Sequence, residues 1–370
     1  MVTPGYSAGD DDWCIPALQD LAFGLGQRHD VHVFSTTYPH RCDDYQVKGI
    51  RVSSLGDGRS GRLALIRRMW RTATAISAAH RHDPFDVLHG FWADAGGIVA
   101  TWAAQRLSIP SVVTVMAGEL SYEPLVGYGK GRRPIAGRIA RYGARHADRL
   151  LVFSGYHADR IRQEQPVLQP SVVPFGTDIE RFGPEGPRQR LDGKIPIVCV
   201  ASLVPVKCHA FLLEAFSLAN SRVPGLHLHL VGEGELAPGL RRQAEQLGIS
   251  RAVTFHGHVE HDFLPAFYRA ASFCVLPSCF ESHGMVILEA AACGRVTIGS
   301  AVGSMAEFCP AEYLSEAGDI PVLAANIQIV ATESNLRSRL AKLAASRFDD
   351  GYSMAQSVLA FESLYQQVAA

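Results

Sequence analysis

The sequence lacks the features that would take the chain into or through a membrane. It opens with MVTPGYSAGDDDW, which has neither the basic start nor the apolar stretch of a signal peptide. No run approaches the ~18 consecutive apolar residues of a membrane-spanning helix. These absences predict a cytoplasmic protein.

The sequence also lacks a charge imbalance and a metal-binding arrangement of cysteines. Its 35 Lys and Arg residues nearly balance its 36 Asp and Glu residues, so the overall charge gives no indication of a nucleic-acid partner. The eight cysteines form no CxxC pair and no metal-ligand spacing. Most lie in apolar runs, where cysteine behaves as a small hydrophobic residue. We therefore expect reduced, structural cysteines at Cys14, Cys42, Cys199, Cys208, Cys274, Cys279, Cys293 and Cys309.

What the sequence does contain is a pattern of short apolar runs that alternate with amphipathic stretches. Its 370 residues are enough for about two domains. Strand-like runs in the first half cover residues 31–36, 85–89, 110–116 and 149–154, with helical patterns such as 95–107 and 134–148 between them. A stretch rich in Gly, Pro and charge at 182–194 is the expected linker. Beyond it, strand-like runs return at 195–201, 226–231, 252–256, 272–276 and 295–299.

Strands that alternate with helices predict parallel sheets covered on both faces. The expected fold class is therefore α/β, with two doubly wound, Rossmann-like domains. We expect an amino-terminal domain over residues 1–180, a second domain over 190–348, and a helix over 349–370 that packs back toward the first domain. Open α/β sheets bind ligands at the carboxyl ends of their strands, so two such domains that face each other would hold a ligand in the cleft between them.

The most informative segment is residues 277–290, PSCFESHGMVILEA. A buried strand is expected to end at Pro277, a short loop carries Glu281, and a helix begins near Gly284 with Glu289 one to two turns inside it. The first turn of such a helix offers free N–H groups and the positive end of the helix dipole, which suit a diphosphate. The two carboxylates can accept hydrogen bonds from sugar or ribose hydroxyls. Alternatively, they are an acid that favours the helix dipole and an acid on a solvated face.

This segment resembles the E-x7-E motif of the retaining, family-four GT-B glycosyltransferases. Other stretches are similar to parts of that family, namely 173–178 (VPFGTD), 201–207 (ASLVPVK), 231–235 (VGEGE) and 301–307 (AVGSMAE). The resemblance spans nearly the whole chain and weakens toward the amino terminus. It implies the GT-B fold and transfer of a sugar from a nucleotide-sugar donor, with retention of configuration and with neither a cofactor nor a metal ion.

The resemblance also implies roles for single residues. Glu281 would contact the donor sugar, Glu289 would hold the ribose hydroxyls, and Lys207 would neutralise the diphosphate together with the helix amino end. Lys207 and Glu281 are thus the expected catalytic residues, because charge on the leaving diphosphate grows in the transition state. The expected donor-binding residues are Ser202, Gly232, Glu233, His283, Gly284, Met285, Val286 and Glu289 in the second domain and Gly5, His89 and Met116 in the first.

The chain departs from the family's pattern at two of these positions. Ser202 stands where the family usually has an arginine, so a guanidinium that would pair with the diphosphate is missing. Met116 stands where the family commonly has a histidine near the reacting sugar, and a thioether cannot accept a proton. In a front-face retaining mechanism the leaving phosphate can accept the acceptor's proton instead. Glu119 could replace the histidine, or it could be a solvated loop acid.

Several of the expected site residues have a structural alternative. Gly5 follows an opening strand that is expected to end at Thr3, and would lie in a loop that faces the donor phosphates. His89 ends a strand-like run and would reach the same edge, or it could be a core histidine. Gly232 and Glu233 could let the backbone approach the base, or could form a simple turn. Residues 10–12 (DDD) are expected to cap a helix that begins at Trp13 rather than to bind a metal.

The sequence does not identify the acceptor, which could be a carbohydrate, a lipid-linked molecule or a small molecule. Residues 128–149 carry one lysine and six arginines against Asp148 alone. Such a stripe can attract an anionic membrane or a phosphorylated acceptor, or can be a solvated helix face. We therefore expect a nucleotide-sugar donor, no nucleic acid, and a place in the cytoplasm or at the inner face of the membrane.

Two other classes of function stay open. A catalytically silent protein that keeps the nucleotide-sugar site is suggested by Ser202 and Met116. A GT-B epimerase or phosphorylase is conceivable because fold does not fix function. The sequence shows neither the carboxylates from both domains that an epimerase needs nor a lysine for pyridoxal phosphate.

Overall fold

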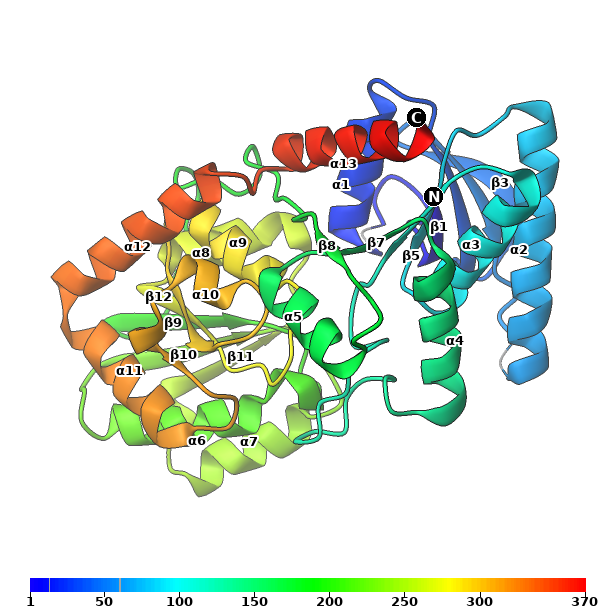
Figure 1. Cartoon of the computed structure of the whole chain (residues 1–370). Coiled ribbons are helices and arrows are strands. Elements are labelled where there is room, and N and C mark those ends of the chain that lie inside the picture. Colours follow the sequence, from blue (N-terminus) through cyan, green and yellow to red (C-terminus); the bar gives the residue numbers. More distant parts are fainter. Residues whose placement is uncertain (13, 60) are drawn as a thin grey trace. The chain divides into compact units, whose positions relative to one another are not determined.

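The computed structural model describes residues 1–12, 14–59 and 61–370, which form two α/β units (Figure 1). The first unit comprises Met1–Tyr122, Gly129–Phe175 and Met354–Ala370, and the second comprises Glu123–Tyr128 and Gly176–Ser353. The chain therefore passes from the first unit to the second between residues 175 and 176, ahead of the stretch at 182–194 where a linker is expected. Residues 182–194 belong to the second unit.

The first unit is built around an eight-stranded sheet with the order β3-β4-β2-β1-β5-β6-β7-β8. Its elements are β1 (Val2–Gly5), α1 (Pro16–Gly26), β2 (His32–Tyr38), β3 (Cys42–Val47), β4 (Ile50–Leu55), α2 (Arg62–His82), β5 (Leu88–Phe91), α3 (Ala95–Leu107), β6 (Ser111–Thr114), α4 (Pro134–His146), β7 (Arg149–Val152), α5 (Gly155–Glu164), β8 (Ser171–Val172) and α13 (Met354–Ala369). Neighbouring strands are parallel except for β3 and β4. Helix α3 packs against α2 and α4, while α13 packs against α1.

Three expectations for the first unit are wrong in their boundaries. Strand β1 continues through Pro4 to Gly5, with a register shift at the proline. Strand β5 covers Leu88–Phe91 rather than 85–89, so His89 is its second residue and not its last. The first helix begins at Pro16, whose missing N–H suits that position.

The acidic residues before that helix do not cap it. Asp12 instead accepts hydrogen bonds from the N–H of Ala8 (2.7 Å) and the hydroxyl of Tyr38 (2.8 Å). Trp13, where the helix was expected to begin, lies outside the described residues. Within the described ranges, no group of three or more His, Cys, Asp or Glu residues could hold a metal ion.

The second unit contains a six-stranded, all-parallel sheet with the order β11-β10-β9-β12-β13-β14. Its elements are β9 (Ile195–Val200), η1 (Pro205–Lys207), α6 (His209–Asn220), β10 (Leu226–Val231), α7 (Ala237–Gln246), η2 (Ser250–Ala252), β11 (Val253–Gly257), η3 (His261–Phe263), α8 (Leu264–Ala270), β12 (Phe273–Leu276), α9 (Met285–Ala292), β13 (Thr297–Ser300), α10 (Met305–Phe308), η4 (Ala311–Tyr313), β14 (Leu314–Ser315), α11 (Ile320–Thr332) and α12 (Ser334–Asp349). The strand order reverses between β9 and β12. That reversal is the switch point at which doubly wound sheets bind their ligands.

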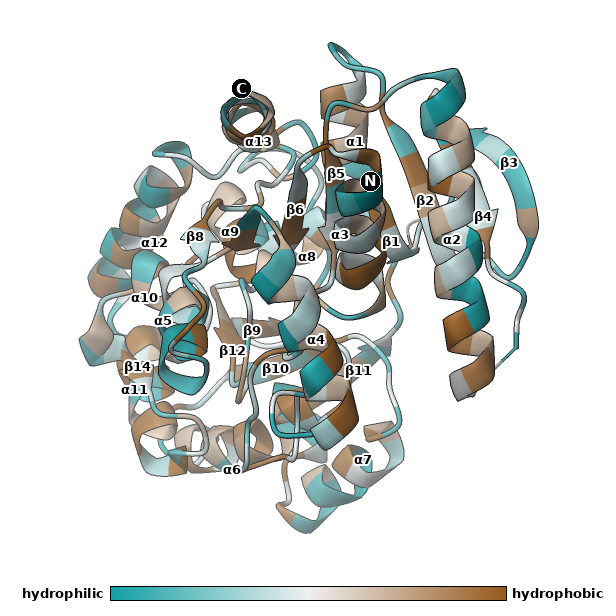
Figure 2. Ribbon diagram, turned by 45° about the vertical axis from the view of Figure 1, so that its right-hand side comes forward, coloured by the Kyte–Doolittle hydropathy of each residue, from teal (hydrophilic) through white to brown (hydrophobic). Residues whose placement is uncertain are grey.

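The apolar runs explain why these strands are internal. Every residue of β10 is buried, as expected for a parallel strand covered on both faces, and Figure 2 shows apolar colours along β9 and β12. Helix α9 is apolar on nearly all sides, which is typical of a helix enclosed by its neighbours. Among the helices in the described part of the chain, none is long and apolar enough to cross a membrane.

Candidate functional site

The candidate site lies at the carboxyl ends of β9 and β12, the two strands at the switch point of the second unit. The loop after β9 leads into η1 and ends at Lys207, while the loop after β12 carries Glu281 and leads into α9. Since β9 and β12 are hydrogen-bonded neighbours, their following loops start side by side. Two motifs 74 residues apart in the sequence therefore come together.

Lys207 and Glu281 form an ion pair at this position. The Lys207 ammonium donates to Glu281 Oε1 at 2.6 Å, and the Ser278 hydroxyl donates to the same oxygen at 2.6 Å. The Glu281 residue is only 8 % exposed, so its charge depends on these two donors rather than on bulk water. The carboxylate and the ammonium are thus fixed beside each other at the start of the loop before α9.

The amino end of α9 follows this pair directly. The helix begins at Met285, as the sequence predicts, and Gly284 precedes it with φ of 90°. A residue with a side chain is disfavoured at that φ, which explains the glycine. Met285 and Val286 are the first two helical residues and are half-buried, so their N–H groups belong to the end of the helix that attracts anions.

Glu289 lies on the second turn of α9 and is buried, with 5 % of the residue exposed. The interpretation of this residue as an acid on a solvated face is therefore wrong. Its Oε2 accepts a hydrogen bond from the Tyr268 hydroxyl at 2.7 Å, and its Oε1 lies 3.2 Å from His261 Nε2. Burial, and secondarily the Glu289 charge, raise the pKa of Tyr268. The tyrosine therefore stays protonated and donates.

A third loop, which follows β13, holds the Glu281 loop from the other side. Ser304 N donates to the carbonyl of His283 at 2.8 Å, and the His283 Nδ1 lies 2.7 Å from Ser304 Oγ. Gly303 has φ of 61°, and a Cβ there would lie 2.5 Å from the His283 carbonyl oxygen. The glycine is required because the two loops touch through their backbones. His283 is buried and links these loops.

The turn with Gly232 and Glu233 packs against the loop after β9. Gly232 has φ of 139°, and a Cβ there would lie 2.1 Å from the carbonyl oxygen of Ala201. The carbonyl of Glu233 accepts a hydrogen bond from Leu203 N at 2.8 Å. These contacts explain the glycine by loop packing alone. Ser202 is exposed in the loop after β9, where it can offer only a hydroxyl in place of the family's guanidinium.

In the first unit, His89 does not reach the carboxyl edge of the sheet, contrary to expectation. It is 2 % exposed within β5, and its two ring nitrogens lie 2.7 Å from the Tyr365 hydroxyl and 2.7 Å from Thr114 Oγ1. Burial holds its pKa well below the ordinary value. The ring is therefore neutral and fully engaged, which supports the core-histidine alternative. Gly5, expected in a loop, is the buried last residue of β1, and a Cβ there would lie 3.2 Å from Cys14 Sγ.

Met116 follows β6 in a loop that Glu119 organises. Glu119 is 2 % exposed, so its interpretation as a solvated loop acid is wrong. Its carboxylate accepts hydrogen bonds from the backbone N–H groups of Ala93 (3.2 Å), Met116 (3.1 Å) and Ala117 (2.7 Å). Burial, and then the Asp94 charge, raise its pKa to about 7 in spite of these donors. Glu119 thus joins the loops that follow β5 and β6.

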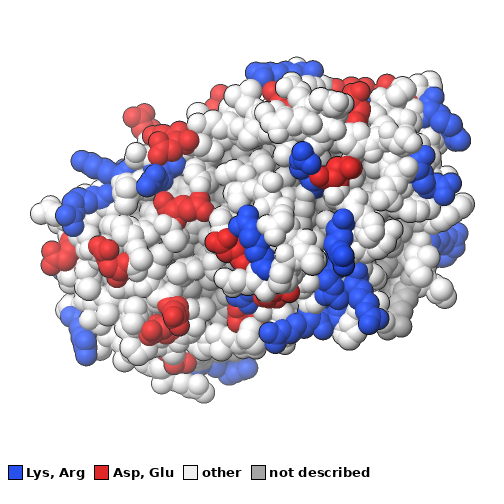
Figure 3. Space-filling model, in the orientation of Figure 1, with Lys and Arg blue, Asp and Glu red and all other residues white. Residues whose placement is uncertain are grey.

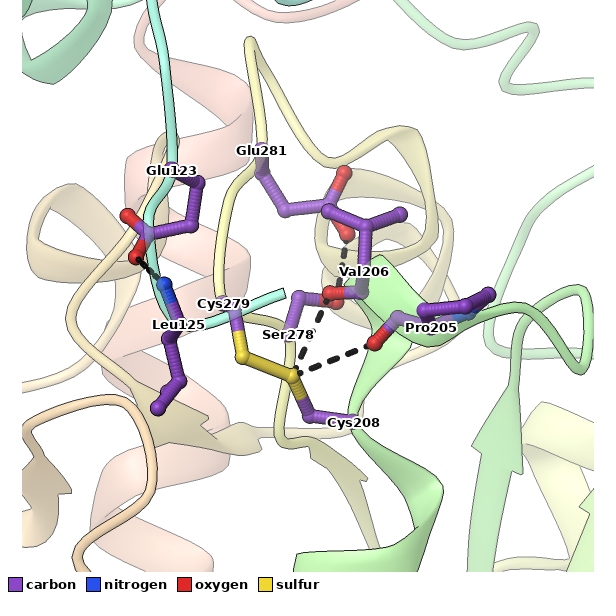
Figure 4. Close-up of a disulfide and its surroundings, with 8 residues drawn as sticks. All are labelled: Glu123, Leu125, Pro205, Val206, Cys208, Ser278, Cys279 and Glu281. Carbon is purple, nitrogen blue, oxygen red and sulfur yellow. Dashed lines mark hydrogen bonds between the residues drawn. A yellow bond between two sulfur atoms is a disulfide. The ribbon is translucent and has the colours of Figure 1, made fainter. Parts of the chain in front are cut away.

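Several residues that build the site were not expected from the sequence, above all a disulfide between Cys208 and Cys279 (Figure 4). The expectation that all eight cysteines are reduced is wrong for this pair, and the other six are free. The cysteines have no informative spacing, because the switch point brings them together only in the fold. One signal was available, since Cys208 follows Lys207 and Cys279 stands two residues before Glu281. Ser278, Tyr268 and His261 gave no comparable signal.

Comparisons with known proteins identify the family of the chain. Residues 194–333 match the family described as glycosyl transferases group 1, and residues 15–176 match the glycosyl transferase 4-like domain. A D-inositol 3-phosphate glycosyltransferase of Geodermatophilus obscurus is 30 % identical over 81 % of this chain and 71 % of its own length. Other relatives of that name are 29–32 % identical, and the aligned part spans 53–62 % of their length.

Solved structures share the fold over nearly the whole chain. Sucrose-phosphate synthase from Thermosynechococcus elongatus has a TM-score of 0.76 and 21 % identity, and the match covers 99 % of this chain and 98 % of the other. The Anabaena protein HepE, in complex with UDP and glucose, has a TM-score of 0.74 and 16 % identity, with 99 % of each chain covered. At these identities the likeness concerns the fold, which has two parallel-sheet, Rossmann-like domains.

Proposed function

The chain belongs to the family-four GT-B glycosyltransferases, and from that premise we propose that it transfers a sugar from its nucleotide-sugar donor with retention of anomeric configuration and without a metal ion. The observation that carries the proposal is the ion pair of Lys207 and Glu281 (2.6 Å) at the switch point, directly ahead of the amino end of α9. One cation, one carboxylate and a set of helix N–H groups are the chemistry that a sugar diphosphate requires.

Departure of the nucleoside diphosphate is the step that these groups favour. Negative charge grows on the diphosphate oxygen as the glycosidic bond breaks, and an ammonium and helix N–H groups stabilise that charge more in the transition state than in the ground state. Lys207 would then turn from Glu281 toward the phosphate, leaving the Glu281 carboxylate to accept hydrogen bonds from the sugar hydroxyls. Glu289, oriented by Tyr268 at 2.7 Å, would hold the ribose hydroxyls.

The residue at position 116 cannot act as a general base for the proton of the acceptor hydroxyl. Met116 cannot accept it, and Glu119 directs its carboxylate at three backbone N–H groups. In a front-face reaction the leaving phosphate accepts this proton, which is consistent with retention. The missing arginine at Ser202 leaves Lys207 as the main cation at the diphosphate.

The acceptor is proposed from the charge of the first unit and the names of the relatives. The exposed side chains of Arg138 and Arg145 lie on α4 with the exposed Ile135 and Tyr142, and Figure 3 shows basic side chains gathered over this helix. Such a face fits a phosphorylated acceptor or an anionic membrane that presents a lipid-linked acceptor. Since the relatives are named for D-inositol 3-phosphate, this phosphorylated polyol is the first acceptor to test.

Two measurements test the proposed function. The full chain is mixed with uridine, guanosine and adenosine diphosphate sugars, with and without D-inositol 3-phosphate, and the free nucleoside diphosphate is measured, with and without a metal chelator. We expect release that depends on the acceptor and is insensitive to the chelator, and NMR of the product should show the donor's anomeric configuration. A protein that is stabilised against heat by nucleotide sugars but releases no diphosphate with any acceptor would instead be catalytically silent.

Membrane contact is tested by flotation with vesicles that contain anionic lipid. The double variant Arg138→Glu/Arg145→Glu should lose most binding, because each basic residue contributes about 1 kcal/mol near an anionic surface. The control is Arg251→Glu/Arg339→Glu, which changes the charge equally at exposed sites of the second unit. Equal binding by both variants would remove the membrane from the proposal.

A further inference from the structure

The disulfide between Cys208 and Cys279 lies next to both expected catalytic residues. Cys208 directly follows Lys207, and Cys279 stands two residues before Glu281. Both cysteines are buried, with 5 % and 1 % exposed. In Figure 4 the bridge runs from the η1 segment to the loop that carries Glu281, so it joins the two loops of the switch point covalently.

Hydrogen bonds also link these two loops. Cys279 N donates to the carbonyl of Val206 at 2.8 Å, and the Lys207 ammonium donates to Glu281 at 2.6 Å. The Lys207 side chain is 24 % exposed, and a pair with one partner in contact with water contributes modestly. The covalent bridge therefore restrains the distance between Lys207 and Glu281 more strongly than this ion pair does.

The backbone of Cys208 adds an independent indication. This residue ends η1 and precedes α6 with φ of 54°, a left-handed conformation that residues other than glycine adopt uncommonly. Such conformations persist where the surrounding structure restrains them, and they gather at functional sites. A side chain that is tied to Cys279 restrains the turn immediately after Lys207.

We propose that the Cys208–Cys279 disulfide is a positioning element of the donor site, which holds Lys207 against Glu281, and that its reduction weakens the binding of a nucleoside diphosphate. The inference rests on the proposed function, since it takes these two residues as the donor site. Cys208 and Cys279 act through their neighbours and touch no substrate themselves.

Reduction by a dithiol would release the bridge in two exchanges. One thiolate of the dithiol attacks a sulfur of the bridge, which forms a mixed disulfide and releases the other cysteine as a thiol. The second thiolate of the dithiol then attacks the dithiol sulfur of the mixed disulfide. The dithiol is thereby oxidised to a cyclic disulfide, and both cysteines become thiols. The Cys208 Sγ lies 3.5 Å from the carbonyl oxygens of Pro205 and Val206. A disulfide sulfur carries no proton, so only the reduced Cys208 thiol can donate a hydrogen bond to these oxygens. After reduction Cys208 therefore has hydrogen-bond acceptors on its own turn, and Cys279 is no longer bonded to it.

The test compares the oxidised and the dithiothreitol-reduced full chain, after the free thiols of each have been counted by alkylation and intact-mass measurement. The affinities for UDP, GDP and ADP are measured by calorimetry well below the unfolding temperature. We expect the Kd of the bound nucleotide to rise about 3- to 10-fold on reduction, as when only a third to a tenth of the molecules keep the competent arrangement. The variant Cys208→Ser/Cys279→Ser should have the Kd of the reduced protein, and dithiothreitol should not change that Kd.

Two further variants separate positioning from mere stability. Cys208→Gly/Cys279→Ser removes the bridge but suits the positive φ, so it should recover thermal stability without recovering affinity. Cys42→Ser removes an exposed free cysteine of the first unit and should keep the response to dithiothreitol. Free thiols at Cys208 and Cys279 in unreduced protein, or equal affinity in the two oxidation states, would overturn the inference.

Amide hydrogen exchange distinguishes a failure of this inference from a failure of the proposed function. Reduction should speed exchange in residues 205–209 and 277–284 together, with no nucleotide present. If exchange responds in this way but no nucleotide binds in either state, the positioning stands and the donor-site assignment is wrong. If nucleotide binds and exchange does not respond, the positioning is wrong and the donor site stands.

Discussion

The carboxyl edges of the two sheets use their buried carboxylates in different ways. In the second unit Glu281 and Glu289 accept hydrogen bonds from side chains, namely the ammonium of Lys207 and the hydroxyls of Ser278 and Tyr268. In the first unit Glu119 accepts its hydrogen bonds from the backbone N–H groups of Ala93, Met116 and Ala117. Side-chain donors can turn to a ligand, whereas backbone donors cannot move without the loop. The carboxyl edge of the sheet in the second unit is therefore suited to bind a ligand, whereas that of the first unit is suited to keep its loops in place.

The largest effect should come from Lys207. Lys207→Ala removes the cation at the diphosphate, and we expect kcat to fall about 10²–10³-fold, as for the loss of one preorganised group that stabilises transition-state charge. Steady-state kinetics with the active donor measures this. Lys342→Ala, at an exposed lysine of α12, is the matched control, and Lys207→Arg should recover part of the rate. Wild-type turnover in Lys207→Ala would discard its phosphate role.

Glu119 should make the first unit sensitive to rising pH. Its pKa is raised from 4.5 to about 7, so the folded state prefers the protonated form. Its contribution to stability is complete below pH 4.5 and is lost as the pH rises through about 7, with a total of about 3 kcal/mol. Glu119→Gln cannot titrate, so the gap in melting temperature between it and the wild type should change between pH 5 and pH 8. A constant gap would contradict the assignment.

Glu289 should give the next largest effect, on binding rather than on folding. Hydrogen bonds to a charged group contribute about 1.5–3 kcal/mol, so Glu289→Ala should weaken nucleoside diphosphate binding about 10- to 100-fold. Calorimetry measures the affinity. Tyr268→Phe removes only the hydroxyl that orients the carboxylate and should cost less. If Glu289→Ala binds the nucleoside diphosphate with wild-type affinity, then Glu289 does not contact the ribose.

The smallest effect should come from His209, which makes the second unit sensitive to falling pH. This residue is 1 % exposed beneath the Lys207 turn, and burial, with a lesser effect from Lys207, lowers its pKa from 6.5 to about 4. The folded state prefers the neutral imidazole. The contribution of His209 to stability is therefore complete above pH 6.5 and is lost as the pH falls through about 4. Between pH 7 and pH 5 the resulting loss of folding stability is about 2 kcal/mol.

His209→Gln should therefore lose less thermal stability on acidification than the wild type. His146→Gln, at an exposed site on α4, should behave like the wild type over the same range. If His209→Gln loses as much stability as the wild type between pH 7 and pH 5, then His209 does not titrate as proposed. Together with Glu119→Gln, this variant tests whether the two units respond to pH in opposite directions.

Local patterns were sufficient for much of the second unit. The run at 226–231 coincides with β10, and the helix expected near Gly284 begins at Met285. Apolar periodicity and a glycine before a helix are local signals. Where those signals are weak the boundaries were wrong, as for β1, which continues through Pro4, and β5, which starts three residues later than expected.

The environment of individual side chains was harder to predict. Glu289 and Glu119 were open to interpretation as solvated acids, yet both are buried, because burial depends on which elements pack over a residue. His89 was expected at the ligand edge and lies in the core between Thr114 and Tyr365. Tyr365 is 276 residues away in the sequence, so no local pattern could supply this partner.

The sequence by itself determined the alternation of strands and helices, the E-x7-E segment and the family, because these depend on neighbours within a few turns of the chain. Only the tertiary structure decided that Lys207 meets Glu281 and that Cys208 meets Cys279, across 74 and 71 residues. The physical reason is the reversal of strand order between β9 and β12. It sets two distant loops side by side, and hydrogen bonding between strands, rather than residue identity within the loops, fixes where they meet.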